Sequence, residues 1–421
     1  MRKASLGTLF FTVFLDLLGF GLVVPFLPGV ARNLGASDLV ATLVAASFSA
    51  MQFLFIPLWG RLSDRVGRRP VLLWSVAASA IGMTLLGFAR TLPLLFFARL
   101  FSGVATANIE VAQAYIADIT TPQTRARGMG IIGMGFGLGF IIGPAVGGFL
   151  GHYELLGQQG TLAAFTAAGL SVINFVMAWR TLPESLPPEK RGKVTGDRRR
   201  ILDLSAIRRV SREPGMGVTL LTSFFVVFWF SGLEVTFRLF TEDAFGMSIA
   251  ATGGVFAFVG VIGVIVQGGL IHRLSRRFGE VKIIRTGLLL LAIGFAADAL
   301  AADIGAWFLY VASLFVASGS GLYNPSLNSY TSQKATPETQ GLTLGVVQSL
   351  SALARVLGPP IGGLCYQYVG MRGPYLVGAV GLVGVFIMSL RLTPLPRRVE
   401  TTIHPKPDAA SPLAPEPIAE P

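Results

Sequence analysis

Long apolar runs alternate with short polar connections along almost the whole chain. Each run is long enough to cross a bilayer, because a helix needs roughly 20 apolar residues to do so. We identify twelve such runs, at about 6–28, 39–60, 70–89, 93–118, 128–150, 160–182, 216–240, 248–271, 282–302, 306–331, 341–366 and 373–392. A segment that crosses lipid must satisfy its backbone hydrogen bonds internally. The runs therefore predict helices rather than open sheets, and an all-α membrane protein.

The longest polar interruption divides the runs into six plus six. We expect an N-terminal six-helix bundle at 1–182, a cytoplasmic central loop at 183–215, a C-terminal six-helix bundle at 216–393 and a disordered, proline-rich tail at 394–421. In the central loop, Ile201, Leu204, Ile207 and Val210 lie near helical spacing among arginines. That pattern suits either an amphipathic helix at the membrane surface or a basic linker without fixed structure.

The composition excludes several classes of protein. Hydrophobic residues make up 52% of the chain and charged residues 13%, against about 25% charged in soluble domains. This composition argues against an ordinary soluble enzyme. The single cysteine, Cys365, excludes an internal disulfide, and the three histidines are far apart in sequence. No phosphate-binding G-x-x-x-x-G-K-[S/T] motif is present. We therefore expect no metal, no cofactor and no use of ATP.

The net charge of +12 is distributed unevenly along the chain. One set of connections holds most of the basic residues, among them Arg2, Lys3, Arg61, Arg65, Arg68, Arg69, Arg125, Arg127, Lys190, Arg191, Arg208, Arg209, Arg273, Arg276, Arg277 and Lys282. The opposite connections hold mainly Arg32, Arg90 and Arg372. Basic loops stay in the cytoplasm, so we expect a plasma (cell inner) membrane protein with both termini cytoplasmic. Because these charges flank membrane segments, we expect no nucleic-acid partner.

The two halves of the chain repeat one another. The glycine-proline run Gly143–Gly148 recurs as Gly358–Gly363, at an offset of 215 residues. Tyr115 matches Tyr330 at the same offset. Two six-helix halves around a central site form the repeat architecture of secondary transporters, and neither a channel nor a membrane enzyme needs it.

Several motifs resemble those of a known family. Residues 60–70 read Gly-Arg-Leu-Ser-Asp-Arg-Val-Gly-Arg-Arg-Pro, Arg99 precedes Gly103, and Asp16 is followed by Gly19, Gly21, Pro25 and Pro28. With the glycine-proline run and residues 114–120, these motifs resemble the major facilitator superfamily, in particular its drug/proton antiporter branch of tetracycline and multidrug efflux transporters. The resemblance extends from about residue 6 to 392. It implies twelve transmembrane helices in two pseudo-repeat bundles that work by alternating access.

The connection between the second and third runs carries a charged motif. We expect Gly60 and Gly67 to form tight turns with positive φ. The members of this candidate cytoplasmic latch are Gly60, Asp64, Arg65, Gly67, Arg68, Arg69, Asp118, Arg125 and Arg127. They either hold the cytoplasmic side shut in the outward-facing state or act as solvated determinants of topology.

Glycines in the fifth run predict a flat helix face. Gly135, Gly139, Gly143, Gly147 and Gly151 follow one another at four-residue spacing, and Pro144 allows a bend. Another backbone can approach such a face closely. It serves as a rocking surface between the halves, as plain close packing, or as both. Its motif also includes Gly148 and, in the second half, Gly358, Pro359, Gly362 and Gly363.

Ionisable residues inside the apolar runs are costly, at about 3 kcal/mol for a charge at the bilayer centre. The candidate proton carriers are Asp16, Glu110 and Glu234, and the candidate basic partners are Arg99, Arg238 and Arg355. Asp16 serves proton coupling, substrate contact or helix packing. Arg99 and Glu110 are about three turns apart, which predicts one shared helix face on which Arg99 tunes an acid or anchors substrate. Glu234 and Arg238, four residues apart, are alternatively an i,i+4 structural pair.

A substrate cavity is expected between the halves. Its candidate residues are Gln113, Asn324, Asn328, Gln348 and Trp229. The amides either bind substrate or bond to neighbouring helices. The 31 phenylalanines suit an apolar cavity for hydrophobic or amphiphilic compounds, including cations, although lipid-facing positions also favour phenylalanine.

Together these patterns predict a monomeric secondary transporter that exports small hydrophobic or amphiphilic compounds in exchange for protons. The alternative is a proton-coupled or facilitative transporter of a sugar or other polar metabolite. An enzyme is not expected, because the sequence shows no catalytic constellation.

Overall fold

Helices account for nearly all of the chain that the structure describes. The structure is a computed structural model and describes residues 6–120, 125–192, 203–335 and 339–394. The first set of helices comprises α1 (Leu6–Val23), α2 (Leu27–Asn33), α3 (Asp38–Val66), α4 (Arg68–Gly87), α5 (Leu92–Ala105), α6 (Ile109–Ile119), α7 (Arg125–His152) and α8 (Thr161–Thr181). The second comprises α10 (Met216–Phe245), α11 (Ile249–Ile265), η2 (Val266–Leu270), α12 (Ile271–Phe278), α13 (Glu280–Ile304), α14 (Phe308–Lys334), α15 (Gln340–Val369) and α16 (Gly373–Ser389). Between them lie η1 (Pro188–Lys190) and α9 (Leu204–Ser211).

The all-α prediction is confirmed, and each of the twelve predicted runs contains a helix. Nine described helical segments are long and apolar enough to cross a membrane, and α16 is a shorter apolar helix. Two runs are interrupted. The first is bent between α1 and α2, where Pro25 and Pro28 remove backbone donors. The fourth is divided into α5 and α6 by a turn at Thr106–Asn108 that contains no proline.

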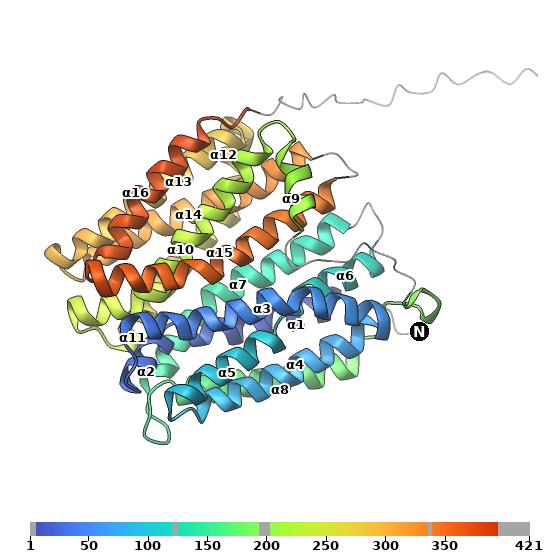
Figure 1. Ribbon diagram of the computed structural model, residues 1–421, viewed down its shortest axis with the longest axis horizontal. Helices are drawn as coiled ribbons and strands as arrows, with labels where there is room; N and C mark the ends of the chain where they lie inside the picture. Colours follow the sequence, from blue (N-terminus) through green and yellow to red (C-terminus); the bar gives the residue numbers. More distant parts are fainter. Residues whose placement is uncertain (1–5, 121–124, 193–202, 336–338, 395–421) are drawn as a thin grey trace, which may run out of the picture.

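The helices pack as two bundles that lie side by side, α1–α8 in one and α10–α16 in the other (Figure 1). Hydrophobic clusters lie around Leu22 and Tyr115 in the first bundle and around Phe240 and Leu288 in the second, and the Leu22 cluster also includes Ile249 of α11. Helix α9 belongs to the second bundle, because Ala206 and Val210 are buried against α10 and α15. For Leu204–Ser211, therefore, the structure favours the amphipathic helix over the unstructured linker.

The glycine stripe of α7 packs against α1 within the first bundle. A Cβ atom added at Gly143 would lie 2.7 Å from the Cα atom of Gly21, and one added at Gly139 would lie 2.7 Å from the Cβ atom of Leu17. The second bundle repeats this arrangement, because a Cβ atom at Gly362 of α15 would lie 3.0 Å from the Cα atom of Gly232 in α10. The stripes therefore hold α1 on α7 and α10 on α15.

The glycines next to these stripes make the contacts between the bundles. A Cβ atom at Gly253 of α11 would lie 2.6 Å from the Cα atom of Gly148 in α7. Gly363 of α15 faces the side chain of Thr42 of α3, and a Cβ atom at Gly363 would lie 3.0 Å from the Cβ atom of Thr42. Gly148 and Gly363 occupy matching positions of the sequence repeat. The two bundles thus meet at two glycine contacts in matching positions, one between the backbones of Gly148 and Gly253 and one between Gly363 and the side chain of Thr42.

A cluster of charges joins the bundles at the same end of the helices. Arg32 donates from Nη1 and Nη2 to the two carboxylate oxygens of Asp243, over 2.7 and 2.8 Å, and from Nε to Asp38 Oδ1 over 2.7 Å. The hydroxyl of Tyr366 donates to Asp243 Oδ2 over 2.6 Å. Arg32 and Asp38 belong to the first bundle, and Asp243 and Tyr366 belong to the second. We call this end of the molecule the Arg32 end, and the opposite end, where Asp64 lies, the Asp64 end.

The contact between Gly148 and Gly253 can be tested with two neighbouring glycines. Gly253→Ala places a methyl group against the backbone of Gly148, whereas a Cβ atom at Gly254 comes no closer than 4.0 Å to the hydroxyl of Tyr310. Overpacking typically costs about 1–3 kcal/mol. We expect Gly253→Ala to lower the melting temperature in detergent by several degrees and Gly254→Ala to leave it nearly unchanged. Equal effects of the two substitutions on the melting temperature would contradict the close contact between Gly148 and Gly253.

The rate of cross-linking across the Arg32 end tests whether the pairing of Arg32 with Asp243 holds that end closed. Leu39 N–H donates to Gln367 Oε1 across the bundles, so Leu39→Cys and Gln367→Cys, in a Cys365→Ser background, should react with a short bifunctional thiol reagent. Neutralising Asp243 by Asp243→Asn removes the bidentate charge pair, and we expect cross-linking to slow several-fold.

Arg372 and Asp303 provide the matched control. They form an ion pair at the same end of the molecule, but both belong to the second bundle. Asp303→Asn should leave the cross-linking rate unchanged. If it slows the reaction as much as Asp243→Asn does, the effect comes from surface charge and not from the contact between bundles.

Candidate functional site

Asp16 lies midway along α1 and faces the point where α5 ends and α6 begins. Its carboxyl group is hydrogen-bonded to the side chain of Asn108. The two residues line a small cavity of about 10 Å³, together with Thr12, Val13, Leu17, Leu72 and Ala112, which is about the space of one water molecule. Asp16 therefore has one polar side-chain partner in otherwise largely apolar surroundings.

The interruption between α5 and α6 is held open by polar side chains from neighbouring helices. Three backbone carbonyls near the break accept hydrogen bonds: Val104 O from Trp59 Nε1 over 2.6 Å, Ala105 O from Ser75 Oγ over 2.5 Å, and Thr106 O from Gln52 Nε2 over 3.2 Å. Asn108 Nδ2 in turn donates to Ser75 Oγ over 2.5 Å. A helix break inside a membrane requires such partners, and discontinuous helices often mark the binding sites of transporters.

The prediction that Arg99 and Glu110 share a continuous helical face is wrong, because this break separates them. Arg99 is buried in α5, and its guanidinium carbon lies 4.4 Å from the centre of the Phe48 ring. Within the described residues, its Nε and Nη1 atoms have no hydrogen-bond partner. Glu110 lies half-buried in the first turn of α6, where Gln113 is also half-buried.

In the second bundle, Glu234 and Arg238 do not form the i,i+4 pair that was one alternative, because Arg238 pairs with Glu242. Glu234 of α10 interacts electrostatically with Arg355 of α15. Arg238 instead forms an ion pair with Glu242 over 3.2 Å and donates to the carbonyl of Met247 over 3.0 Å. Glu234 and Arg355 therefore influence each other electrostatically from two helices, without an ion pair within 4 Å among the described residues, while Arg238 lies toward the Arg32 end.

The candidate substrate residues divide into two groups. Asn324 and Asn328 of α14 and Gln348 of α15 are exposed, so their amides are accessible to water or to a ligand. Trp229 is half-buried. Its indole ring fills a slot on α16 where Gly378 and Gly381 have no side chains, so it packs inside the second bundle.

The predicted latch residues gather at the Asp64 end of the first bundle. Arg68 lies 2.5 Å from Asp64 Oδ1 and 3.3 Å from Asp118 Oδ2, and it donates to Ser63 Oγ over 2.6 Å. Arg65 is exposed. The side chains of Arg125 and Arg127 lie outside the described residues.

One latch glycine forms a turn and the other does not. Gly67 has a φ of 114° and separates α3 from α4, as predicted. Gly60 lies inside α3, and the prediction of a turn there is wrong, because the helix continues through it to Val66.

Three groups in the structure received no role in the sequence analysis. Asn108 and Ser75 could have been found as polar residues within apolar runs. The pairing of Arg32 with Asp243 left no local signal, since 211 positions separate the two residues. Asp298 is buried in α13, and its Oδ1 atom has no hydrogen-bond partner among the described residues.

The described residues offer no metal site: no group of three or more histidine, cysteine, aspartate or glutamate side chains among them is placed to hold an ion.

Comparison with known proteins gives the family. A family model described as Major Facilitator Superfamily matches residues 9–358 and, in a second match, 270–420. Tetracycline resistance protein, class C, from Escherichia coli is 33% identical over 360 residues, which cover 83% of this chain and 86% of the relative. Major facilitator superfamily domain-containing protein 10 from Bos taurus is 29% identical over 445 residues, which cover 94% of each chain.

A solved structure agrees with these sequence relatives. The crystal structure of the human organic anion transporter MFSD10 (TETRAN) superposes with a TM-score of 0.69 at 27% identity, and the match covers 91% of this chain and 98% of that one. The chain therefore belongs to the major facilitator superfamily and is a membrane transporter of small molecules, not an enzyme.

Proposed function

We propose that this protein exports small hydrophobic or amphiphilic compounds across the plasma membrane in exchange for protons. The observation that carries the proposal is the half-buried carboxyl of Asp16, which contacts Asn108 at a break in the neighbouring helix. The similarity of the chain to a tetracycline resistance protein supports small hydrophobic or amphiphilic compounds as the class of substrate. As a monomer with two bundles, it would work by alternating access.

The distribution of basic residues supports an orientation with the Asp64 end in the cytoplasm. Arg61, Arg65 and Arg273 are exposed at that end, and basic residues favour the cytoplasmic side. Both termini would then be cytoplasmic. Because the contacts of Arg32 and Gly148 close the opposite end, we assign the structure to an inward-facing state.

Asp16 is the leading candidate for the proton carrier. A lone carboxylate in apolar surroundings is costly unless it is paired or neutralised. A proton or a bound substrate near Asn108 could each stabilise this site, so the two compete, which is the requirement for exchange. Glu110 and Glu234 are the alternative carriers, with Arg355 as the basic partner of Glu234.

The proton gradient supplies enough free energy for this task. A potential of about 100 mV contributes about 2.3 kcal/mol per charge, and a pH difference of half a unit contributes about 0.7 kcal/mol. A total of about 3 kcal/mol sustains a substrate gradient of roughly 100-fold.

We also propose that Asp64, Arg68 and Asp118 hold the Asp64 end shut in the opposite, outward-facing state. In the inward-facing state their ion pairs lie within one bundle, so they are available to helix ends of the second bundle when that end closes.

Transport of an organic anion is the second candidate function. The buried guanidinium of Arg99, which rests on Phe48, favours it, as does the similarity to a human organic anion transporter. Competition separates the two candidates: a lipophilic cation should inhibit uptake of a labelled substrate under the first, and a lipophilic carboxylate under the second.

Substitution of the three acids tests the coupling. In proteoliposomes with an imposed pH gradient, we expect at least one of Asp16→Asn, Glu110→Gln and Glu234→Gln to abolish uphill transport and keep downhill exchange. Asp303→Asn, at an exposed ion pair, is the control and should pump normally. Normal pumping by all three test variants would remove proton coupling from the proposal.

The role of Asn108 is tested by a pH profile. Asn108→Leu removes the amide that contacts both Asp16 and Ser75, so we expect the pH dependence of exchange to shift while the protein still folds. Asn174 provides the control, since its buried amide donates to Thr12 O on α1 over 3.0 Å without contacting Asp16 in this way. Asn174→Leu should cost stability, about 1–3 kcal/mol for a lost buried partner, without shifting the profile. Identical profiles for Asn108→Leu and the unmodified protein would show that Asn108 does not act through Asp16.

A further inference from the structure

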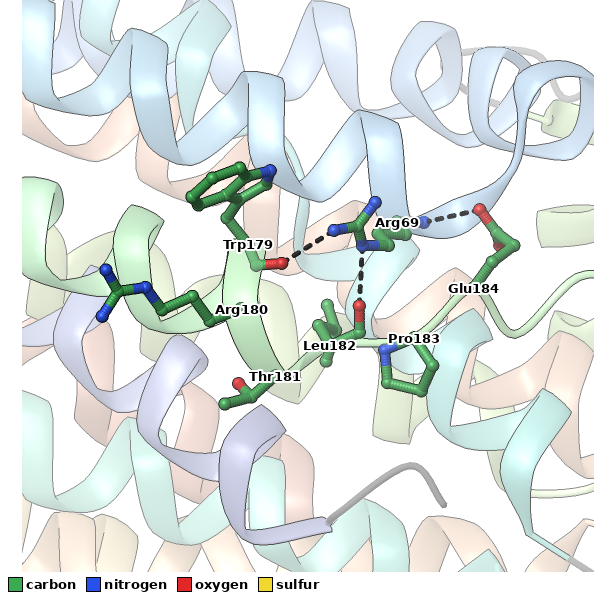
Figure 2. A pocket seen from close by; sticks show the side chains of 7 residues that line it. All are labelled: Arg69, Trp179, Arg180, Thr181, Leu182, Pro183 and Glu184. Carbon is green, nitrogen blue, oxygen red and sulfur yellow. Dashed lines mark hydrogen bonds between the residues drawn. The ribbon is translucent and has the colours of Figure 1, made fainter. Parts of the chain in front are cut away.

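A pocket opens on the outer face of the first bundle, at the Asp64 end. Its volume is about 310 Å³, and it lies where α8 ends and α4 begins. Its lining residues are Arg69, Trp179, Arg180, Thr181, Leu182, Pro183 and Glu184 (Figure 2). Helices α4 and α8 lie on the side of the first bundle that faces away from the second (Figure 1). The pocket is therefore separate from the site around Asp16 and borders the space that lipid occupies.

The charges of the pocket are fixed in place. Arg69 donates from Nε to Leu182 O and from Nη2 to Trp179 O, both over 2.7 Å. The carboxylate of Glu184 accepts from the backbone N–H groups of Arg68 and Arg69, over 2.8 and 3.2 Å, and so caps the start of α4. Arg180 extends to the side away from Glu184 (Figure 2). Two guanidinium groups thus lie at the membrane boundary, and the nearby carboxylate is engaged by a helix N-terminus.

Exposed apolar side chains continue from the pocket along both helices. Trp179, 56% exposed, lies at the rim, and tryptophan with arginine is typical of the level of lipid headgroups. Trp74 and Ile81 of α4 and Ile173 of α8 are each more than half exposed. The surface therefore combines a cationic pocket with an apolar face about the length of an acyl chain, and this combination fits a molecule that has an anionic head and hydrocarbon tails.

We propose that this pocket binds the phosphate headgroup of an anionic membrane phospholipid, with its acyl chains along α4 and α8. Arginine binds phosphate oxygens through several N–H donors in one plane, and basic pockets between transmembrane helices bind acidic headgroups. A bound lipid would brace the Arg69 contacts that join the start of α4 to the end of α8.

The second bundle contains a related helix end that serves as an internal control. Arg285 of α13 donates to Leu390 O and Leu392 O at the end of α16, both over 3.1 Å, as Arg69 does for α8. Arg391 follows Leu390 there as Arg180 follows Trp179. The two helix ends thus share the arginine pattern and differ at the aromatic residue.

Native mass spectrometry of the purified full chain tests the proposal. Phosphatidylglycerol and phosphatidylcholine with identical acyl chains are added separately, and the dissociation constant of the first bound lipid is compared. Arg180→Gln should weaken phosphatidylglycerol binding about 5-fold, the effect of roughly 1 kcal/mol for one basic residue near the surface. Trp179→Leu should weaken both lipids, and Arg391→Gln should weaken neither. An unchanged melting temperature shows that each variant is folded.

The competing outcomes are distinct. Equal affinity for the two lipids, or an equal loss in Arg391→Gln and Arg180→Gln, would overturn the proposal, because either result means nonspecific lipid or charge binding. Glycerol 3-phosphate and inorganic phosphate are added as soluble competitors. If either displaces phosphatidylglycerol at equimolar concentration, the pocket recognises a free phosphate and the lipid assignment is wrong.

Discussion

The close approach of helix backbones at glycine is the constraint on which the rest of the structure depends. Gly143 and Gly147 let α1 lie directly on α7, and Gly358 and Gly362 let α10 lie on α15. In each case the next glycine, Gly148 or Gly363, faces the other bundle. The glycine-proline motif therefore has two functions. Its striped glycines pack two helices of one bundle together, and the glycine beside the stripe lets the two bundles meet. The charge pair of Arg32 and Asp243 joins the bundles at the same end, and the proposed alternating access requires these contacts to separate when the Asp64 end closes.

Charges inside the apolar bundles follow a related rule, since each needs a partner or a polar cavity. The two halves meet this need differently. In the first, a helix break supplies Asn108 to Asp16, and in the second, Arg355 of α15 interacts with Glu234 of α10. The backbone repeat is thus symmetric, while the chemistry is not.

Much of this organisation could be predicted from the sequence, because membrane helices follow from the length of apolar runs and the repeat follows from Gly143–Gly148 and Gly358–Gly363. The errors have physical causes. The break at Thr106–Asn108 is produced by hydrogen bonds from α3 and α4, which periodicity within one helix cannot reveal, and it separates Arg99 from Glu110. Gly60 resembles a turn residue but lies inside a helix, because a glycine in a membrane helix more often serves packing. The partner of Arg32 depends on how whole bundles dock.

Alternating closure of the two ends, controlled by the protonation of Asp16, is the central claim. It is tested most directly by pulsed electron paramagnetic resonance in lipid nanodiscs, with one spin-label pair at positions 39 and 367 at the Arg32 end and another at positions 61 and 273 at the Asp64 end. Asp16→Asn mimics the protonated acid. We expect this substitution to change the two distance distributions in opposite directions, so that one end closes as the other opens. Distributions that stay unchanged, or that lengthen at both ends, would contradict it.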